Sequence, residues 1–209
     1  MALACAGIPV ETAAVRLLTL QLHEPLPGRV LPLIAELHGH DEAARRYRAI
    51  VLTTLRQLRG LANTRLRLLP EPVDAAEALR FWLLPRLAQR WQSSATVFRS
   101  DGWEIDFGDE PGSYQIEAFG DILCPFLCAR WVHTALLGLE RGTHQVRGPA
   151  SGGGEYFRAG PVTGPAANPD LLEERTLPEL PVIRNHDHWL EALDSPLGPA
   201  LQKAWEAEG

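Results

Sequence analysis

A glycine-rich segment at residues 148–154 is the first place where this sequence could do chemistry. It reads Gly-Pro-Ala-Ser-Gly-Gly-Gly and leads directly into Glu155 and Tyr156. No Lys-Ser or Lys-Thr pair follows the glycines, which argues against a phosphate-binding loop of the usual type. Ser151 lacks the spacing of a nucleophile elbow, because that motif needs glycine where this chain has Pro149. The segment is predicted to be a tight turn whose dihedral angles suit glycine, beside a ligand or another stretch of backbone.

Two histidine-containing segments could offer metal ligands. They are His38-Gly-His40-Asp41 and His186-Asp-His188. Two histidines at i and i+2 do not share a helix face, although they can share the face of a strand or a loop. Neither segment has a recognised zinc spacing. We therefore interpret them as helix starts, with Asp41 as a cap, and keep a metal site as the alternative.

Glu104 and Asp106 form a third candidate site. They are two residues apart on a strand predicted at residues 103–107, so both side chains lie on the same face. The pair could bind a cation. A solvated edge strand protected by its charges is the simpler interpretation.

The cysteines are too few for a disulfide framework. Cys5, Cys124 and Cys128 are predicted to be reduced thiols. Cys124 and Cys128 are four residues apart, which is a weak metal or redox signal, and buried thiols are the preferred interpretation.

Length and composition indicate one folded domain spanning residues 1–209. Hydrophobic residues make up 45% of the chain and charged residues 22%. The net charge of -6 lacks the basic character of a general nucleic-acid binder. No run of about 18 apolar residues occurs, so no membrane span is expected. Glu11 and Arg16 interrupt the apolar start, which argues against a signal peptide, and we expect a cytoplasmic protein.

Strand and helix patterns alternate along most of the chain. A buried strand is predicted at residues 15–22, and apolar positions at helical spacing predict a helix at 42–58. Further helices are expected at 30–37, 74–82 and 125–139, and further strands at 64–69, 144–146 and 155–159. The tail at 161–209 is predicted to be loop-rich, with short helices at 170–174, 186–193 and 197–206.

The middle of the chain follows a different pattern. Residues 96–99 and 103–107 are predicted to form a hairpin around Asp101-Gly102. A second turn at 109–113 leads to a strand at 114–119. Together these three strands predict an antiparallel meander.

These patterns predict an α/β fold: a single three-layer domain with a mixed, mainly parallel sheet, helices on both faces and a central antiparallel meander. In open α/β sheets, ligands bind beyond the carboxyl ends of the strands. Three loops are expected at that edge, at residues 25–29, 120–125 and 148–154.

Those three loops carry a resemblance to a known family. Pro25-Leu-Pro-Gly-Arg-Val30 resembles the Pro-x-Pro-Gly-x-Val opening of a bacterial family of putative nucleotide-diphospho-sugar transferases. Cys124-Pro125, followed by Leu127, resembles the family's Gly-Ser-Asp-Cys-Pro-x-Leu strand end. Residues 148–156 resemble its Gly-Pro-Ala-x-Asp-Gly-Gly-Tyr segment. The three motifs occur in the family's order, at similar spacing, over about residues 15–160.

The resemblance implies a glycosyltransferase-A-like fold and transfer of a sugar from a nucleotide-diphosphate donor. A nucleotide sugar is then the partner, and Mg²⁺ or Mn²⁺ is the cofactor of an active enzyme. Gly28 and Arg29 are expected on the nucleotide side. The sugar or acceptor side would be shaped by Gly148, Pro149, Gly153, Gly154 and Tyr156.

The chain departs from the family at its charged positions. The family's Lys-Thr-Arg falls on Leu31, Pro32 and Leu33, and its metal-binding aspartate falls on Leu123. Asp121 lies two positions earlier, so we expect it to act as a displaced metal ligand and catalytic residue.

Two alternatives follow from these departures. The chain could be a catalytically inactive scaffold that acts as a binding or assembly protein, because fold does not guarantee chemistry. Alternatively, transfer could proceed without a metal, if Arg147 or Arg158 points into the cleft. A homo-oligomer is left open.

Overall fold

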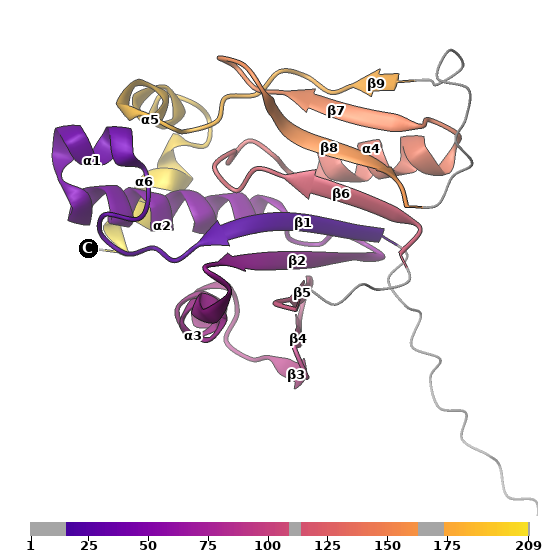
Figure 1. Cartoon of the computed structure of the whole chain (residues 1–209), viewed down its shortest axis with the longest axis horizontal. Helices are drawn as coiled ribbons and strands as arrows, with labels where there is room; N and C mark the ends of the chain where they lie inside the picture. Colours follow the sequence, from indigo (N-terminus) through magenta and orange to yellow (C-terminus); the bar gives the residue numbers. More distant parts are fainter. Residues whose placement is uncertain (1–15, 109–113, 163–173, 209) are drawn as a thin grey trace, which may run out of the picture.

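The computed structural model describes residues 16–108, 114–162 and 174–208. Its nine-stranded mixed sheet has the order β3-β4-β5-β2-β1-β6-β8-β7-β9 (Figure 1). The strands are β1 (Arg16–His23), β2 (Thr64–Glu71), β3 (Gln92–Ser94), β4 (Val97–Ser100), β5 (Trp103–Asp106), β6 (Ile116–Gly120), β7 (Gln145–Pro149), β8 (Glu155–Pro161) and β9 (Glu174–Thr176). The helices are α1 (Pro32–His38), α2 (His40–Gln57), α3 (Ala76–Leu87), α4 (Ala129–Glu140), α5 (His186–Leu193) and α6 (Gly198–Glu206), with a 3-10 turn at Val73–Ala75.

The centre of the sheet is parallel. Strand β1 pairs in parallel with β2 on one side and with β6 on the other, and β2 pairs in parallel with β5. The apolar run of β1 suits a central strand, because β1 has neighbours on both edges and Leu18, Leu20 and Leu22 are buried. The predicted α/β fold with a mixed sheet is therefore confirmed.

The outer strands are largely antiparallel. Strands β3, β4 and β5 form a meander on one side, and β8 joins β6 and β7 in antiparallel pairing on the other. Strand β9, which the sequence did not predict, pairs in parallel with β7.

Three predictions lie outside the described residues. They concern the turn at 109–113, most of the helix at 170–174, and Cys5.

The predicted meander is wrong in its third strand. The strand exists as β6, but it pairs with β1 and not with β5. The reason is that both edges of β5 are already paired, with β4 and with β2, whereas β1 has a free edge. For the same reason β5 is not the edge strand that was expected. Asp106 is buried there and accepts hydrogen bonds from Thr96 and Gly108.

Two helices begin or end differently from the prediction. Helix α4 begins at Ala129 rather than at Pro125, which lies in a loop. Pro85 lies inside α3 and does not end it. Because proline has no N–H, the carbonyl of Phe81 loses its helical partner, and α3 ends two residues later at Leu87.

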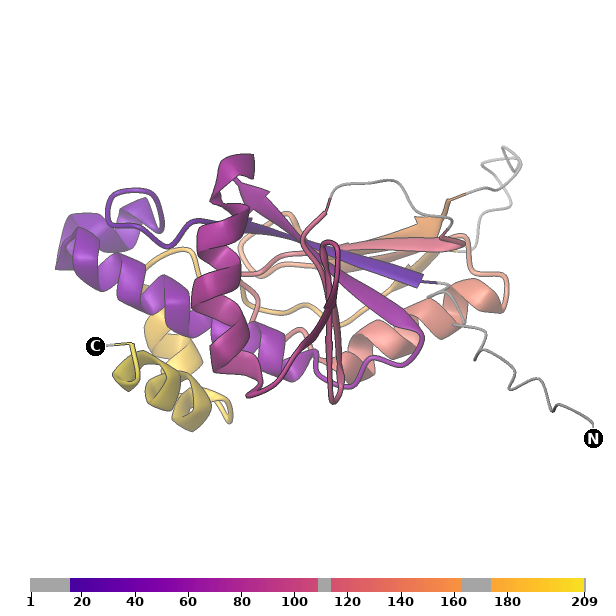
Figure 2. The ribbon, with the colours of Figure 1, turned by 90° about the horizontal axis from the view of Figure 1, so that it is seen from below.

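Helices α2, α4, α5 and α6 lie on one face of the sheet, whereas α3 stands across its edge (Figure 2). Figure 2 shows α2 and α4 beneath the sheet, with α5 and α6 further out, and no described helix covers the opposite face. Helix α6 packs on α2, and α5 packs on α6. The layers are therefore the sheet, then α2 with α4, then α6 with α5, instead of helices on both faces. We call the uncovered side the bare face.

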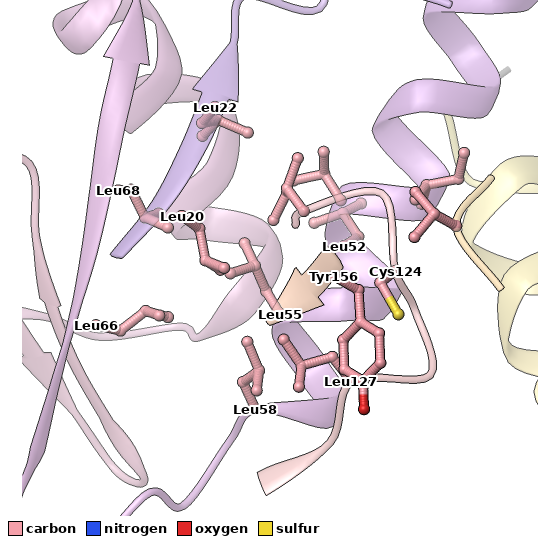
Figure 3. Close-up of a cluster of buried hydrophobic side chains, with 14 of the residues drawn as sticks. Leu20, Leu22, Leu52, Leu55, Leu58, Leu66, Leu68, Cys124, Leu127 and Tyr156 are labelled. Atoms are coloured by element: carbon pink, nitrogen blue, oxygen red, sulfur yellow. The ribbon is translucent and has the colours of Figure 1, made fainter. Parts of the chain in front are cut away.

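Leucines form much of the core between the sheet and α2. Figure 3 shows strand residues Leu20 and Leu68 directed toward Leu55 of α2 and Leu58 just after it, all of them essentially inaccessible to water. Tyr156 packs in the same core beside Cys124 and Leu127, which lie in the loop after β6. Burial of these side chains holds the loop after β6 against the sheet.

Gly148 makes room for the ring of Tyr156. A Cβ atom at Gly148 would lie 2.5 Å from Cζ of Tyr156. Gly148→Ala should therefore destabilise the fold by about 1–3 kcal/mol, because a buried ring must shift. Urea unfolding measures the change. The control is Gly160→Ala, whose Cβ would lie 3.6 Å from the His144 carbonyl oxygen, an ordinary contact. Equal stabilities of the two variants would contradict this explanation.

The two histidine segments meet between α1 and α5. Nε2 of His38 lies 3.1 Å from Nδ1 of His186, and a guanidinium nitrogen of Arg46 lies 3.2 Å from that same Nδ1. Because arginine only donates, the His186 nitrogen accepts, and His38 must donate its N–H to it. Among the described residues no third ligand completes a metal site here. The pair is a neutral hydrogen bond that ties α5 to α1.

This pair should make stability depend on pH. The pKa of His38 is lowered by partial loss of hydration, then by the charge of Arg46 and by His186, while Glu42 opposes the shift. A histidine with a lowered pKa stabilises the fold fully above about pH 6.5 and progressively less as the pH falls below that value. We expect the melting temperature of the protein to fall between pH 7.5 and 5.5, and to fall less in His38→Gln. Identical pH profiles would contradict the assignment.

Candidate functional site

A crevice of about 350 Å³ opens where β1 and β6 end. Its walls come from the last residues of β1 and β6, the loop after β6 and the start of β8. The lining residues are Gln21, His23, Phe119, Gly120, Asp121, Ile122, Leu123, Glu155, Tyr156, Phe157 and Arg158. The volume falls in the range of small-molecule sites, which is about 300–1,000 Å³.

The three predicted loops follow strands that run in the same direction. Strands β1 and β6 are parallel, and β7 runs parallel to β6 because β8 is antiparallel to both. The loops at 25–29, 120–125 and 148–154 therefore lie at one edge of the sheet, as the sequence predicted (Figure 1). The loop after β6 lines the crevice, whereas the other two loops contribute no lining residue.

Asp121 lines the crevice, and both of its carboxylate oxygens accept hydrogen bonds. Oδ1 accepts from the backbone N–H of Leu123 at 2.9 Å, and Oδ2 accepts from Nη2 of Arg184 at 3.2 Å. The Asp121 N–H donates to the Tyr156 carbonyl at 2.8 Å, which joins the loop to β8. Sequence reasoning missed Arg184, because 63 residues separate it from Asp121.

The donor set around Asp121 does not fit Mg²⁺ or Mn²⁺. Within residues 16–108, 114–162 and 174–208, no group of three or more His, Cys, Asp or Glu side chains could hold a metal ion. These cations need several oxygen ligands, and here one carboxylate is shared between an N–H and a guanidinium. Leu123 brings an apolar side chain to the crevice, at the position of the family's aspartate.

Arg158 is the basic residue that lines the crevice. It is exposed and has no ion-pair partner in the part of the chain that the structure describes. Arg147, the other candidate, is 3.5 Å from Glu155 and 2.9 Å from Glu174. Of the two arginines considered from the sequence, Arg158 is therefore the one available to an anion.

The residues expected on the nucleotide side lie outside the crevice walls. Gly28 adopts a φ of 81° in the loop after β1. Arg29 is paired with Glu24, its Nη1 lying 2.9 Å from a carboxylate oxygen. The loop therefore lies at this edge of the sheet, but Glu24 already neutralises the charge of Arg29.

Of the residues expected on the sugar side, Tyr156 lines the crevice. Its hydroxyl donates to the Pro178 carbonyl at 2.9 Å, and burial raises its pKa. It is therefore a neutral structural group rather than a base. Gly148 and Pro149 end β7, and the turn that contains Gly153 and Gly154 closes with a 3.0 Å bond between the Ala150 N–H and the Gly154 carbonyl.

His23, Gln21 and Glu71 are site residues that the sequence analysis missed. Nε2 of His23 lies 3.7 Å from a carboxylate oxygen of Glu71, and the Gln21 side-chain amide donates to the same oxygen. They occupy the carboxyl ends of β1 and β2. Ligands bind beyond the carboxyl ends of such strands. The signal that could have identified these residues is therefore their position at the ends of β1 and β2, where His23 and Glu71 lie just beyond the predicted strands.

Cys124, in the loop that lines the crevice, is not a nucleophile at neutral pH. Its side chain is buried, and burial raises its pKa to about 12. A thiolate is the reactive form of cysteine, so the buried thiol stays inert. This agrees with the interpretation of Cys124 as a buried thiol.

None of the described helices combines the length and the apolar character that crossing a bilayer requires.

Comparisons with known proteins identify similar folds rather than close relatives. No protein-family model matches the sequence, and no curated protein does. A solved structure of a putative nucleotide-diphospho-sugar transferase from Desulfovibrio desulfuricans G20 is similar with a TM-score of 0.62 and 20% identity, over 93% of this chain and 96% of that one.

Two further proteins are similar at lower scores. Rv0371c from Mycobacterium tuberculosis H37Rv is 12% identical, with a TM-score of 0.49 over 88% of this chain and 100% of that one. The structure of its complex with manganese is 14% identical, with a TM-score of 0.43 over 86% of this chain and 98% of that one. The 4-diphosphocytidyl-2C-methyl-D-erythritol synthase of Anaerococcus prevotii DSM 20548 is 9% identical, with a TM-score of 0.48 over 91% and 97%.

Of these similarities, the one to the Desulfovibrio protein has a TM-score above 0.5 and supports a conclusion. That conclusion concerns the fold alone. The fold that the three loop motifs predict is thereby confirmed. This chain has a nucleotide-diphospho-sugar-transferase-like fold, a single α/β domain built on a mixed sheet.

Proposed function

We propose that the chain binds a nucleotide-diphospho-sugar in the crevice, with arginine side chains in place of a divalent cation. The observation that carries the proposal is Arg158, a crevice-lining cation without an ion-pair partner in the described parts of the chain. The fold similarity to a putative nucleotide-diphospho-sugar transferase supports the choice of ligand class.

Arg158 has the chemistry that a diphosphate requires. A guanidinium group forms two parallel N–H···O bonds with phosphate oxygens, and charge-assisted bonds of this kind are about twice as strong as neutral ones. A guanidinium group also presents five N–H donors in a planar fork. One such group at a crevice wall supplies positive charge without the ligand set that a metal needs.

Arg184 is the second cation in the proposal. Its Nη2 is engaged by Asp121, but a guanidinium has five N–H groups, so others remain free to donate. Its side chain is about half exposed. In this proposal Asp121 acts as a positioning residue that holds Arg184 at the crevice, and not as a metal ligand.

The apolar replacements support binding without a cation. Leu31 is buried in the core, and Leu123 lines the crevice, so neither position can neutralise phosphate charge. Mg²⁺ and Mn²⁺ need several oxygen ligands, and among the described residues no group of three or more His, Cys, Asp or Glu side chains could hold a metal ion. The inactive-scaffold alternative therefore fits better than metal-dependent transfer.

Metal-free sugar transfer is a second candidate function. The same two arginines would stabilise the negative charge that builds on a departing diphosphate. Arg158, lining the crevice as this alternative required, is the observation in its favour.

Ligand binding should not depend on a metal. UDP-glucose, GDP-mannose and ADP-glucose are each added with Mg²⁺, with Mn²⁺ and with EDTA, and the melting temperature is measured. A ligand that binds only the folded state raises it. We expect at least one of these nucleotide sugars to raise it equally in all three conditions. A shift that EDTA abolishes, or none with any of the three, would overturn the proposal.

Arg158→Gln should weaken binding of that nucleotide sugar by tenfold or more. A hydrogen bond to a charged group contributes about 1.5–3 kcal/mol, and about 1.4 kcal/mol corresponds to tenfold in affinity. Isothermal titration calorimetry measures the change. Arg141→Gln is the control, because Arg141 is exposed at the end of α4 and does not line the crevice. Equal effects of the two substitutions would argue against a role for Arg158.

A further inference from the structure

Phe119 exposes an aromatic ring inside the crevice. Its side chain is 48% exposed, and it is the one large exposed hydrophobic residue among the described residues that lines this crevice. Phe81 is also exposed, at 84%, but it lies on α3 and lines a separate groove. Exposed apolar residues are common on proteins, so exposure alone means little. The position of Phe119 beside Arg158 in a crevice is what requires an explanation.

The neighbours of Phe119 leave its ring uncovered. In the sheet register, Phe119 of β6 lies between Thr19 of β1 and Arg158 of β8. Side chains at paired positions stand on the same face, with Cβ atoms about 5 Å apart. Thr19 is small and buried, so the ring rises above it, and no described helix lies over this face (Figure 2). The ring and the Arg158 side chain are therefore adjacent on the bare face.

We infer that Phe119 is a stacking platform for the base of a nucleoside diphosphate whose phosphates bind Arg158. This inference rests on the proposed function and adds the orientation of the ligand. An aromatic ring offers a π-face on which every base can stack. A ribose separates base from diphosphate, so a ring beside a cation matches the order of groups in the ligand.

The remaining polar groups suit the sugar end. His23, Asp121 and Glu155 line the crevice and carry nitrogen or oxygen atoms that hydrogen-bond to hydroxyl groups. Phe119 has no such atom and contributes only an apolar face. The base is therefore assigned to Phe119, and the sugar to the end of the crevice formed by the loop after β6.

The test compares ligands with and without a base. Affinities of UDP, GDP, ADP and inorganic pyrophosphate are measured by calorimetry for the unchanged protein, Phe119→Leu, Phe119→Tyr and Phe81→Leu. Phe119→Leu should weaken the nucleoside diphosphate that binds best by about tenfold and leave pyrophosphate unchanged. Phe119→Tyr keeps the aromatic face and should retain the affinity, and Phe81→Leu should change nothing.

The outcomes separate this inference from the function on which it rests. If a nucleoside diphosphate binds but Phe119→Leu has no effect, or if pyrophosphate binds equally well, the stacking inference is overturned and the diphosphate site stands. If Phe119→Leu weakens pyrophosphate as much as the nucleoside diphosphate, the residue is only structural and the inference is again overturned. If neither kind of ligand binds, both proposals fail.

Discussion

The parallel pairing of β1 with β2 and β6 is the constraint on which the site depends. The apolar residues of β1 are buried, and its two edges form hydrogen bonds with β2 and β6 along shared registers. Because parallel strands end at one edge, His23, Glu71 and Asp121 come from distant parts of the chain to the same place. A slip of one residue in β6 would turn Phe119 into the core and bury the wrong face.

Near β5, the bare face of the sheet is covered by paired charged and polar side chains rather than by helices. Near β5, Arg65 lies 2.7 Å from Glu104, and its Nη1 lies 3.2 Å from the Tyr114 hydroxyl. These partners neutralise and cover that half of the face. On the other half, Phe119 and Arg158 have no comparable cover. The ring of Phe119 and the guanidinium-bearing side chain of Arg158 thus lie beside each other and line the crevice.

Arginine and a divalent cation differ in the chemistry that they could offer at this edge of the sheet. A divalent cation concentrates charge at a point and needs several fixed oxygen ligands, whereas a guanidinium spreads its charge over a plane and brings its own donors. Asp121 illustrates the change, because its carboxylate meets a guanidinium and an N–H instead of a metal. The turns resemble those of the transferase family in their glycines and prolines, while the side chains at the family's charged positions differ.

Local signals in the sequence predicted the elements well. The apolar run before Leu22, the helical spacing after Asp41 and the Asp101-Gly102 turn each specify backbone conformation through neighbouring residues, and each element is present. The order of the three loop motifs also predicted the fold, because glycine permits backbone conformations that other residues avoid and proline fixes φ, so both mark the same turns in similar folds. Asp121 was selected because it lies two positions before Leu123, where the resembled family has its aspartate; it does line the crevice, but its oxygens accept from an N–H and a guanidinium.

By itself, the sequence determined the strands other than β3 and β9, the main helices and the edge of the sheet at which their loops meet. Only the tertiary structure decided which strand β6 would join, because pairing depends on which edge remains free after β5 has paired on both sides. It also decided the partners that meet across long separations, such as Arg184 with Asp121 and His38 with His186. Such contacts follow from the packing of whole elements, and no local pattern around either residue encodes them.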